Sequence, residues 1–478
     1  MTTNRKVFSN MIWRFLERVG AQLVQFVVSV VLARILVPED YGIIALVTVF
    51  ISVMNVFVDS GLGTALVQKK DADNIDFSTV FYTNVVFCLL LYFLLFITAP
   101  FIARFYNNDE LTRIIRVLSL TVVISGIKNI QQSFVSKTLQ FKKFFFSTLI
   151  GTIAASVVGI ILAIRGFGVW ALVAQQLTNL ATDTLILWIT VKWRPDFVFS
   201  FKRLKDLFSF GWKLLFSSLL ETVYSNLRNL IIGKKYSSED LAFYSKGAGL
   251  PDLIVGNINN AIDSVLFPVM AEEQDDKSRV KAMTRRAIKT STYCIAPFLM
   301  GLAGCAPIVI HIIYTDKWLP CVPYLRIFCF ANMFYPIHSA NLNAIKAVGR
   351  SDLFLKLEII KKVVGMIILL ATMNFGVIVM AYSVLLWSFI CQIINAWPNK
   401  KLLNYSYLEQ MKDILPGITI SVIMGIGVSL FNLLDCNEWI KLILQISSGV
   451  IFFITVSLLF KLESFFYIKN MIFQKIRK

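Results

Sequence analysis

Long apolar runs constrain the fold of this chain more than any other feature. A stretch of about 18 or more apolar residues is long enough to cross a bilayer as a helix, and the first three such runs cover 11–36, 41–66 and 84–103. The chain is 57% hydrophobic and only 16% charged, with a mean hydropathy of +0.70. The first run is too long for a cleavable signal peptide, so we expect it to be retained. The sequence therefore predicts an all-α, polytopic membrane protein.

About fourteen spans follow from these runs, and the charges of the loops orient them. The predicted spans are 11–36, 41–66, 78–103, 113–136, 143–164, 168–191, 207–232, 240–268, 284–313, 321–345, 353–374, 376–398, 413–433 and 438–460. With both termini inside, the inner segments hold about 29 basic residues and the outer segments about seven. Because cytoplasmic loops are enriched in Lys and Arg, both termini are predicted to be cytoplasmic, in the inner (plasma) membrane.

Three short motifs recur in register in the two halves of the chain. Trp13-Arg14 corresponds to Trp212-Lys213, Pro38-Glu39-Asp40-Tyr41-Gly42 to Ser238-Glu239-Asp240-Leu241-Ala242, and Phe167-Gly168-Val169 to Phe375-Gly376-Val377. Six spans separate each pair, so the halves share one orientation and form a parallel repeat, a known plan for transporters. We expect an N-terminal lobe at 1–195 (spans 1–6), a C-terminal lobe at 196–400 (linker and spans 7–12), a central cleft between them, and appended spans 13–14 with a cytoplasmic tail at 401–478.

Several charged and amide side chains interrupt the predicted spans. Buried charges are costly in lipid, so they face a cavity or a partner. Span 1 carries Arg14, Glu17, Arg18, Gln22, Gln25 and Ser29, and all of these except Glu17 share one face. Span 7 repeats the spacing with Lys213, Ser217, Glu221, Tyr224 and Arg228. Single charges lie at a similar depth in the first lobe: Arg18, Asp59, Lys128 and Asp183. Span 8 is the most polar, with Lys246, Asp252, Asn257, Asn260 and Asp263.

Simpler interpretations of the same residues remain open. Arg14 and Arg18 lie near a helix end, where long side chains reach the headgroups, and Asp59 and Asp183 fit structural ion pairs equally well. The glycines of Gly61-Leu62-Gly63 favour a cap or close packing over phosphate binding. Seven scattered cysteines and two isolated histidines indicate packing residues and no metal site, and we expect no cofactor.

The charge balance and the short loops exclude two broad classes of function. The net charge of +18 follows from the basic cytoplasmic loops of a membrane protein, so we expect no nucleic-acid partner. The longest predicted outer loop, near residues 105–112, has no room for an external catalytic domain. The sequence therefore does not predict an enzyme.

Two motifs carry a resemblance to a known family. The segments 32–42 (LARILVPEDYG) and 59–68 (DSGLGTALVQ), on a background of fourteen spans, resemble the Wzx-type polysaccharide exporters of the multidrug/oligosaccharidyl-lipid/polysaccharide superfamily, and more narrowly the colanic-acid-exporter-like branch. The resemblance implies alternating-access translocation of an undecaprenyl-diphosphate-linked repeat unit for lipopolysaccharide, capsule or exopolysaccharide synthesis. A membrane lipid, a glycan polymerase and assembly proteins are the partners it implies.

The cationic cavity that the resemblance implies assigns roles to the intramembrane polar residues. The expected substrate contacts are Arg14, Arg18, Gln22, Gln25, Lys128, Arg228 and Lys246. The expected ion-coupling or ion-pair residues are Glu17, Asp59, Asp183, Glu221 and Asp263. Since carboxylates share the layer with the basic residues, the sequence does not separate ligand contacts from ion pairs.

Three other functions compete with export. A cation-coupled drug or small-molecule antiporter of the same superfamily would favour unpaired carboxylates over Arg and Lys. A membrane glycan polymerase or ligase would need a catalytic base and a large external loop. A purely structural subunit would leave the polar stripes of spans 1 and 7 without a purpose.

Overall fold

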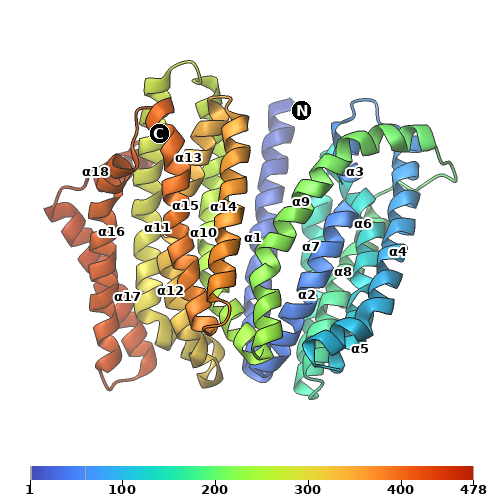
Figure 1. The fold of residues 1–478 in the computed structure, drawn as a ribbon, viewed down its shortest axis with the longest axis horizontal. Helices are drawn as coiled ribbons and strands as arrows, with labels where there is room; N and C mark the ends of the chain where they lie inside the picture. The colour runs from blue at the N-terminus through green and yellow to red at the C-terminus, as the bar shows by residue number, and fades with distance from the viewer. Residues whose placement is uncertain (1–2, 60, 477–478) are drawn as a thin grey trace. The chain divides into compact units, whose positions relative to one another are not determined.

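The protein is built of α-helices joined by short loops. A computed structural model describes the backbone of residues 3–59 and 61–476, and the side chains of these residues except 3–12, 14–19, 209–211, 213, 260–261, 264–265 and 471–476. The chain folds into two compact units, Met1–Ala242 and Phe243–Lys478. Figure 1 shows the helices of each unit as a bundle of elongated rods. The predicted all-α architecture is confirmed.

The first unit contains the helices up to the start of α10. They are α1 (Thr3–Ile35), α2 (Pro38–Asp59), α3 (Leu62–Gln68), α4 (Asn74–Tyr106), α5 (Glu110–Leu118), α6 (Leu120–Lys137), α7 (Lys142–Ile164), α8 (Val169–Thr190) and α9 (Phe201–Lys235). Helix α7 packs against α1 and α8, while α9 packs against α2, α3 and α4. Leu66, Phe77, Ile130 and Leu187 join α3, α4, α6 and α8 in a buried core.

The second unit is organised around one long helix. Its elements are α10 (Ser238–Glu272, whose first turn belongs to the first unit), α11 (Lys277–Tyr314), the short 3-10 helix η1 (Asp316–Cys321), α12 (Val322–Asn332), α13 (Tyr335–Ala347), α14 (Ser351–Thr372), α15 (Val377–Leu402), α16 (Tyr407–Leu430), η2 (Phe431–Leu433), α17 (Glu438–Leu459) and α18 (Glu463–Ile476). Helix α11 packs against α12, α13, α16, α17 and α18, so it forms the centre of this bundle (Figure 1).

Each predicted span lies over one helix or over consecutive short helices. The predicted spans 113–136 and 321–345 are both interrupted, as α5–α6 and as α12–α13. Pro336 stands in the first turn of α13, where a residue without an amide hydrogen cannot continue the preceding helix. At the other break, the Ser119 and Thr121 hydroxyls donate to the carbonyls of Arg116 and Leu118, which competes with backbone pairing.

The predicted repeat anchors adopt the same local geometry in both halves. A carboxylate oxygen of Asp40 accepts from the amide of Val37 at 3.3 Å, and one of Asp240 accepts from the amide of Ser237 at 3.2 Å. Gly168 and Gly376 both precede a helix with positive φ, +53° and +101°, which an L side chain rarely adopts. The matched caps support the internal repeat.

Composition and exposure together fit a membrane environment. Within the described residues, seven helical stretches are long and apolar enough to cross a membrane: α2–α3, α4, α7, α11, α15, α16–η2 and α17. Large apolar side chains such as Leu90, Ile97 and Phe101 of α4 and Ile443 and Ile451 of α17 are exposed, as expected of helices that face lipid.

The roles predicted for the glycines of Gly61-Leu62-Gly63, a helix cap and close packing, are confirmed. Gly61 caps α3 with a φ of +69°. A Cβ on Gly63 would lie 2.7 Å from Ser133 Oγ and 2.9 Å from Asn129 Oδ1, so a side chain at this position would clash with α6.

The predicted domain boundaries stay predictions. The sequence predicts a lobe boundary at 195/196, whereas α9 packs within the first unit.

Candidate functional site

A buried ion pair joins α6 and α8 in the first unit. Lys128 Nζ lies 2.5 Å from Asp183 Oδ2, and the two side chains are only 14% and 7% exposed. Because α6 and α8 pack against each other, each charge meets its counter-charge away from water. The structure therefore brings together two residues that the sequence predicted separately. Asp183 forms the ion pair that one of its two interpretations expected.

Asp59 lies beside this pair at the C-terminal end of α2. Its Oδ1 accepts a hydrogen bond of 2.8 Å from the amide of Asn129, the residue next to Lys128. A carboxylate at a helix C-terminus is disfavoured by the helix dipole, so the amide donor compensates part of that cost. The Asp59 side chain is exposed on its unit, unlike Asp183. The α2–α6–α8 cluster thus presents one accessible carboxylate beside one neutralised pair.

The polar stripe of span 1 is only partly visible. The side chains of Arg14, Glu17 and Arg18 lie outside the described residues, so their predicted roles stay predictions. Further along α1, Gln25 is exposed, whereas Gln22 and Ser29 are half-buried. In α9, Glu221 is exposed and Arg228 is half-buried. They are seven residues apart, or about two helical turns, and so share a face of that helix.

In the second unit, α10 presents two carboxylates that hydrogen-bond to side chains of α12 and α13. Asp252 accepts from the amide of Asn332 at 2.6 Å. Asp263 accepts from the amides of Asn259 and Asn343, at 2.8 and 2.7 Å, and from the Ser339 hydroxyl. Neutral donors surround Asp263, and no ion pair to it is recorded among the described side chains.

Lys246 of α10 packs against aromatic rings. Its ammonium lies 4.8 Å from the ring centre of Tyr314 and 5.4 Å from that of Trp318. The negative faces of such rings attract a cation, and Trp318 is fully buried. The structure thus surrounds the predicted substrate contact Lys246 with protein groups of α11 and η1.

Sequence reasoning missed the amide and hydroxyl partners of the carboxylates. These partners are Asn129, Asn332, Ser339 and Asn343. An amide within an apolar run was the available signal, because lipid offers it no hydrogen-bond partner.

The side chains that could bind a metal form no evident centre within the part of the chain described. No group of three or more His, Cys, Asp or Glu could hold a metal ion there. All seven cysteines are free, and only Cys436 is exposed. His338 lies between Ser388 and Asn395, at 3.4 and 3.3 Å, in the packing role that its sequence context predicts.

Comparison with known proteins identifies the family of this chain. A family model described as "Polysaccharide biosynthesis protein" matches residues 31–323, more than half of the chain. The chain belongs to this family. The predicted membership among the Wzx-type exporters is confirmed at this level, and the narrower colanic-acid branch stays a prediction. The family consists of membrane transporters and not of enzymes, which excludes the glycan polymerase or ligase alternative.

Two curated relatives and one solved structure are similar to this chain over most of its length. The chain is 26% identical over 389 residues to the teichuronic acid biosynthesis protein TuaB of Bacillus subtilis, covering 80% of each chain. It is 24% identical over 449 residues to the lipopolysaccharide biosynthesis protein WzxC of Escherichia coli, covering 89% of each chain. The solved structure of the lipid II flippase MurJ superposes with a TM-score of 0.73 at 16% identity, over 95% of this chain and 99% of that one. The last likeness shows the fold, and with it a multi-pass membrane protein.

Proposed function

We propose that this protein moves an undecaprenyl-diphosphate-linked oligosaccharide or polysaccharide repeat unit across the inner membrane, from the cytoplasmic to the outer leaflet. The family match over 31–323 is the observation that carries the proposal. The relatives named above act in the synthesis of teichuronic acid and lipopolysaccharide, two surface polymers. A lipid-linked intermediate is the common chemistry that such a pathway would present to a membrane transporter.

The finer topology belongs to the same proposal. Fourteen predicted spans over described helices, and a basic excess of about 29 to seven on one side, support both termini inside. The two repeated lobes then enclose the substrate path and open alternately to each leaflet, with α16 and α17 appended.

The roles of the polar residues stay part of the proposal. Arg14, Arg18, Gln22, Gln25 and Arg228 are offered as contacts to the diphosphate and the sugars, since Arg binds phosphate in a bidentate manner. Lys128 would share its charge between Asp183, its partner in the structure, and the substrate. The accessible Asp59, with Glu17, Glu221 and Asp263, is offered for ion coupling or charge balance.

A deletion strain tests the function directly. We expect loss of surface polysaccharide and accumulation of the lipid-linked oligosaccharide on the cytoplasmic leaflet, both restored by the wild-type gene. Arg18→Gln should restore neither, at a normal level of membrane protein, because it removes a phosphate ligand. Accumulation on the outer leaflet would place the defect after translocation and contradict the proposal.

The antiporter alternative gives a different result in the same strain. A cation-coupled drug antiporter would change drug tolerance and leave the lipid-linked oligosaccharide at its normal level. The level of the lipid-linked oligosaccharide therefore separates the two functions, and the family match over 31–323 is the observation that favours export.

A further inference from the structure

The start of α11 and the C-terminal helix α18 form a basic pocket in the second unit. Four cationic side chains and one carboxylate line a cavity of about 530 Å³ between them: Lys281, Arg285, Arg286, Lys289 and Glu463, with Tyr467 on the α18 side. Helix α11 has no acidic residue along its 38 positions. At 1.5 Å per residue the helix is about 57 Å long, so part of it extends beyond a hydrocarbon core of roughly 30 Å.

The cations of this basic pocket are not all neutralised by the protein. Arg285 hydrogen-bonds to both oxygens of Asp413, at 2.8 and 2.6 Å, and Lys289 pairs with Glu463. Arg286 stacks its guanidinium 4.9 Å from the ring centre of Tyr467, and no carboxylate partner of Arg286 is recorded among the described side chains. A cavity with surplus positive charge attracts an anion.

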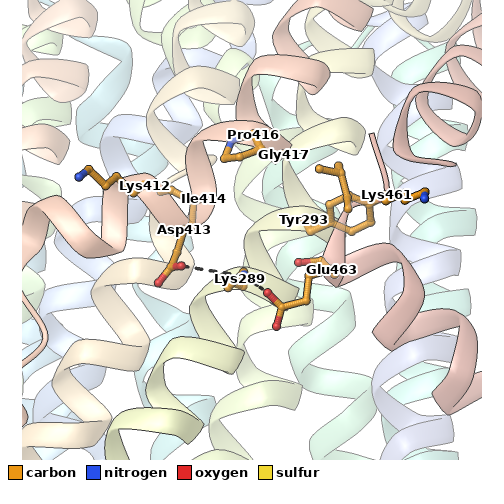
Figure 2. A pocket seen from close by; sticks show the side chains of 11 residues that line it. Lys289, Tyr293, Lys412, Asp413, Ile414, Pro416, Gly417, Lys461 and Glu463 are labelled. Carbon is orange, nitrogen blue, oxygen red and sulfur yellow. Dashed lines mark hydrogen bonds and ion pairs between the residues drawn. The ribbon is translucent and has the colours of Figure 1, made fainter. Parts of the chain in front are cut away.

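A second, smaller cavity extends the positive region toward the core of the bundle. It measures about 180 Å³ and shares Lys289 and Glu463 with the basic pocket, while Lys412 and Lys461 add two more cations. Figure 2 shows Lys289 between Asp413 and Glu463, and Tyr293 lines the same cavity.

An apolar groove begins where the smaller cavity ends. Tyr293 lines both, and the groove then follows α11, α16 and α17 past Pro297, Phe298, Gly301 and Phe453, with Phe465 and Ile468 of α18 at its polar end. Its volume is about 620 Å³. The basic cavities therefore adjoin a long apolar groove. This arrangement is complementary to a membrane phospholipid, which joins an anionic headgroup to apolar acyl chains.

We propose that the α11–α18 basic pocket binds the phosphate headgroup of an acidic phospholipid of the phosphatidylglycerol class, with an acyl chain lying in the α11–α16–α17 groove. Basic pockets between membrane helices recognise anionic headgroups, and the surplus cation Arg286 is placed to pair with the phosphate. The groove supplies apolar burial that a free phosphate ion would not use. The bound lipid would hold α18 against α11, a function separate from the transport of a glycan substrate.

The test compares full-length protein in two nanodisc compositions, neutral phosphatidylcholine alone and phosphatidylcholine with phosphatidylglycerol. We expect phosphatidylglycerol to be retained on native mass spectrometry after detergent transfer and to raise the melting temperature. Both effects should weaken at high salt, since the screening length falls from about 10 Å at 0.1 M to about 3 Å at 1 M. Equal retention of phosphatidylcholine would overturn the proposal.

Variants separate the headgroup from the chain. Arg286→Gln should weaken phosphatidylglycerol retention about fivefold, while Lys401→Gln, an exposed basic residue of α15 outside the pocket, makes the same change in net charge and should leave it unaltered. Gly301→Leu, which fills the groove beside Met424, should also reduce retention. Unchanged retention in both Arg286→Gln and Gly301→Leu contradicts the assignment.

The lipid assignment can still be tested if a variant fails to fold or if the site binds a soluble anion. If Arg286→Gln yields no folded protein, the wild-type comparison of the two lipids at low and high salt still supports or contradicts the site. Displacement of phosphatidylglycerol by millimolar inorganic phosphate would show a site for a soluble anion, and the lipid assignment would fail. Export of polysaccharide in the deletion strain is scored separately, so failure of one proposal does not affect the other.

Discussion

At the scale of single residues, the Lys128–Asp183 pair shows how a membrane helix carries a charge. An unpaired charge at the centre of a helix is expensive in lipid, yet here the two side chains lie 2.5 Å apart and almost buried. Removing one partner of a buried pair is far more harmful than removing both, because the remaining charge has no compensation.

Lys128→Gln should therefore reduce the yield and melting temperature of the folded protein, by roughly 3–5 kcal/mol of unfolding free energy. The double variant Lys128→Gln/Asp183→Asn should recover most of that loss. If Lys128 also contacts the substrate, the double variant is stable and still fails to export. The measurements are thermal unfolding in detergent and surface polysaccharide in the deletion strain.

The exposed Lys70, with no ion pair recorded among the described residues, gives the control for this series. Lys70→Gln should keep both normal stability and normal export. A double variant as unstable as Lys128→Gln would show that the pair does not account for the loss of stability.

Acid should remove a second contact, between Asp73 and Arg203. The hydrogen bond from the Arg203 guanidinium, with that from the Asp76 amide, lowers the pKa of Asp73 to about 2. A depressed pKa stabilises the fold above the unfolded pKa of about 3.9, and this stabilisation is lost as the pH falls through about 2. The melting-temperature difference between wild type and Asp73→Asn should thus be present at pH 6 and shrink between pH 4 and pH 2. A difference of the same size at pH 6 and at pH 2 would contradict this contribution.

Sequence reasoning located the charges but not their partners. Asp59, Lys128 and Asp183 stand out because each is a single charge in an apolar run. Their pairing depends on which faces of α2, α6 and α8 meet, and helical periodicity within one segment does not determine that. Asn129 was missed for the same reason, since its importance comes only from the approach of Asp59.

At the scale of helices, the close approach of two backbones determines where a side chain cannot fit. A Cβ on Gly42 of α2 would lie 1.7 Å from the carbonyl oxygen of Ser238, far inside any contact distance. The neighbouring repeat motifs Pro38-Glu39-Asp40 and Ser238-Glu239-Asp240 are therefore in direct contact through a residue that must lack a side chain.

Gly42→Ala should force these helix starts apart and destabilise the protein by about 1–3 kcal/mol. Gly427→Ala of α16 is the matched control, because nothing lies within 4 Å of its added Cβ. Alanine favours a helix over glycine by up to about 1 kcal/mol, so the control should be neutral or stabilising. Thermal unfolding of both variants measures the contrast, and equal melting temperatures would contradict the close approach.

The helices themselves were largely predictable, whereas their interruptions were not. Each long apolar run proved to be helical, and the repeated glycines at 168 and 376 marked two helix starts. The breaks near Ser119 and Phe334 lie inside continuous apolar runs, where hydropathy does not register a local loss of backbone hydrogen bonds. Helix α18 was missed because its 14 residues are too few to span a bilayer.

At the scale of the whole molecule, orientation is the property that links the repeat to transport. The short motifs identified the family, and the family match confirms it. The sugar that is carried depends on contacts with a substrate, and neither composition nor periodicity reports them. The orientation of the spans can be tested directly.

Reporter fusions should place Asn108 and Ser237 outside and Lys401 inside. The reason is the charge bias of the loops. Six spans, an even number, separate equivalent positions of the repeat, so these positions lie on the same side of the membrane. Alkaline phosphatase and fluorescent-protein fusions measure the two sides independently. An internal signal at Ser237 would contradict both the topology and the parallel repeat.

The pairing of Lys128 with Asp183 also bears on energetics across a polarised membrane. Moving one elementary charge through 100 mV changes the free energy by about 2.3 kcal/mol. A pair with no net charge, attached to the packed helices α6 and α8, can shift in depth with almost no such change. The protein can thus carry a lysine within its apolar interior while the membrane voltage exerts almost no net force on it.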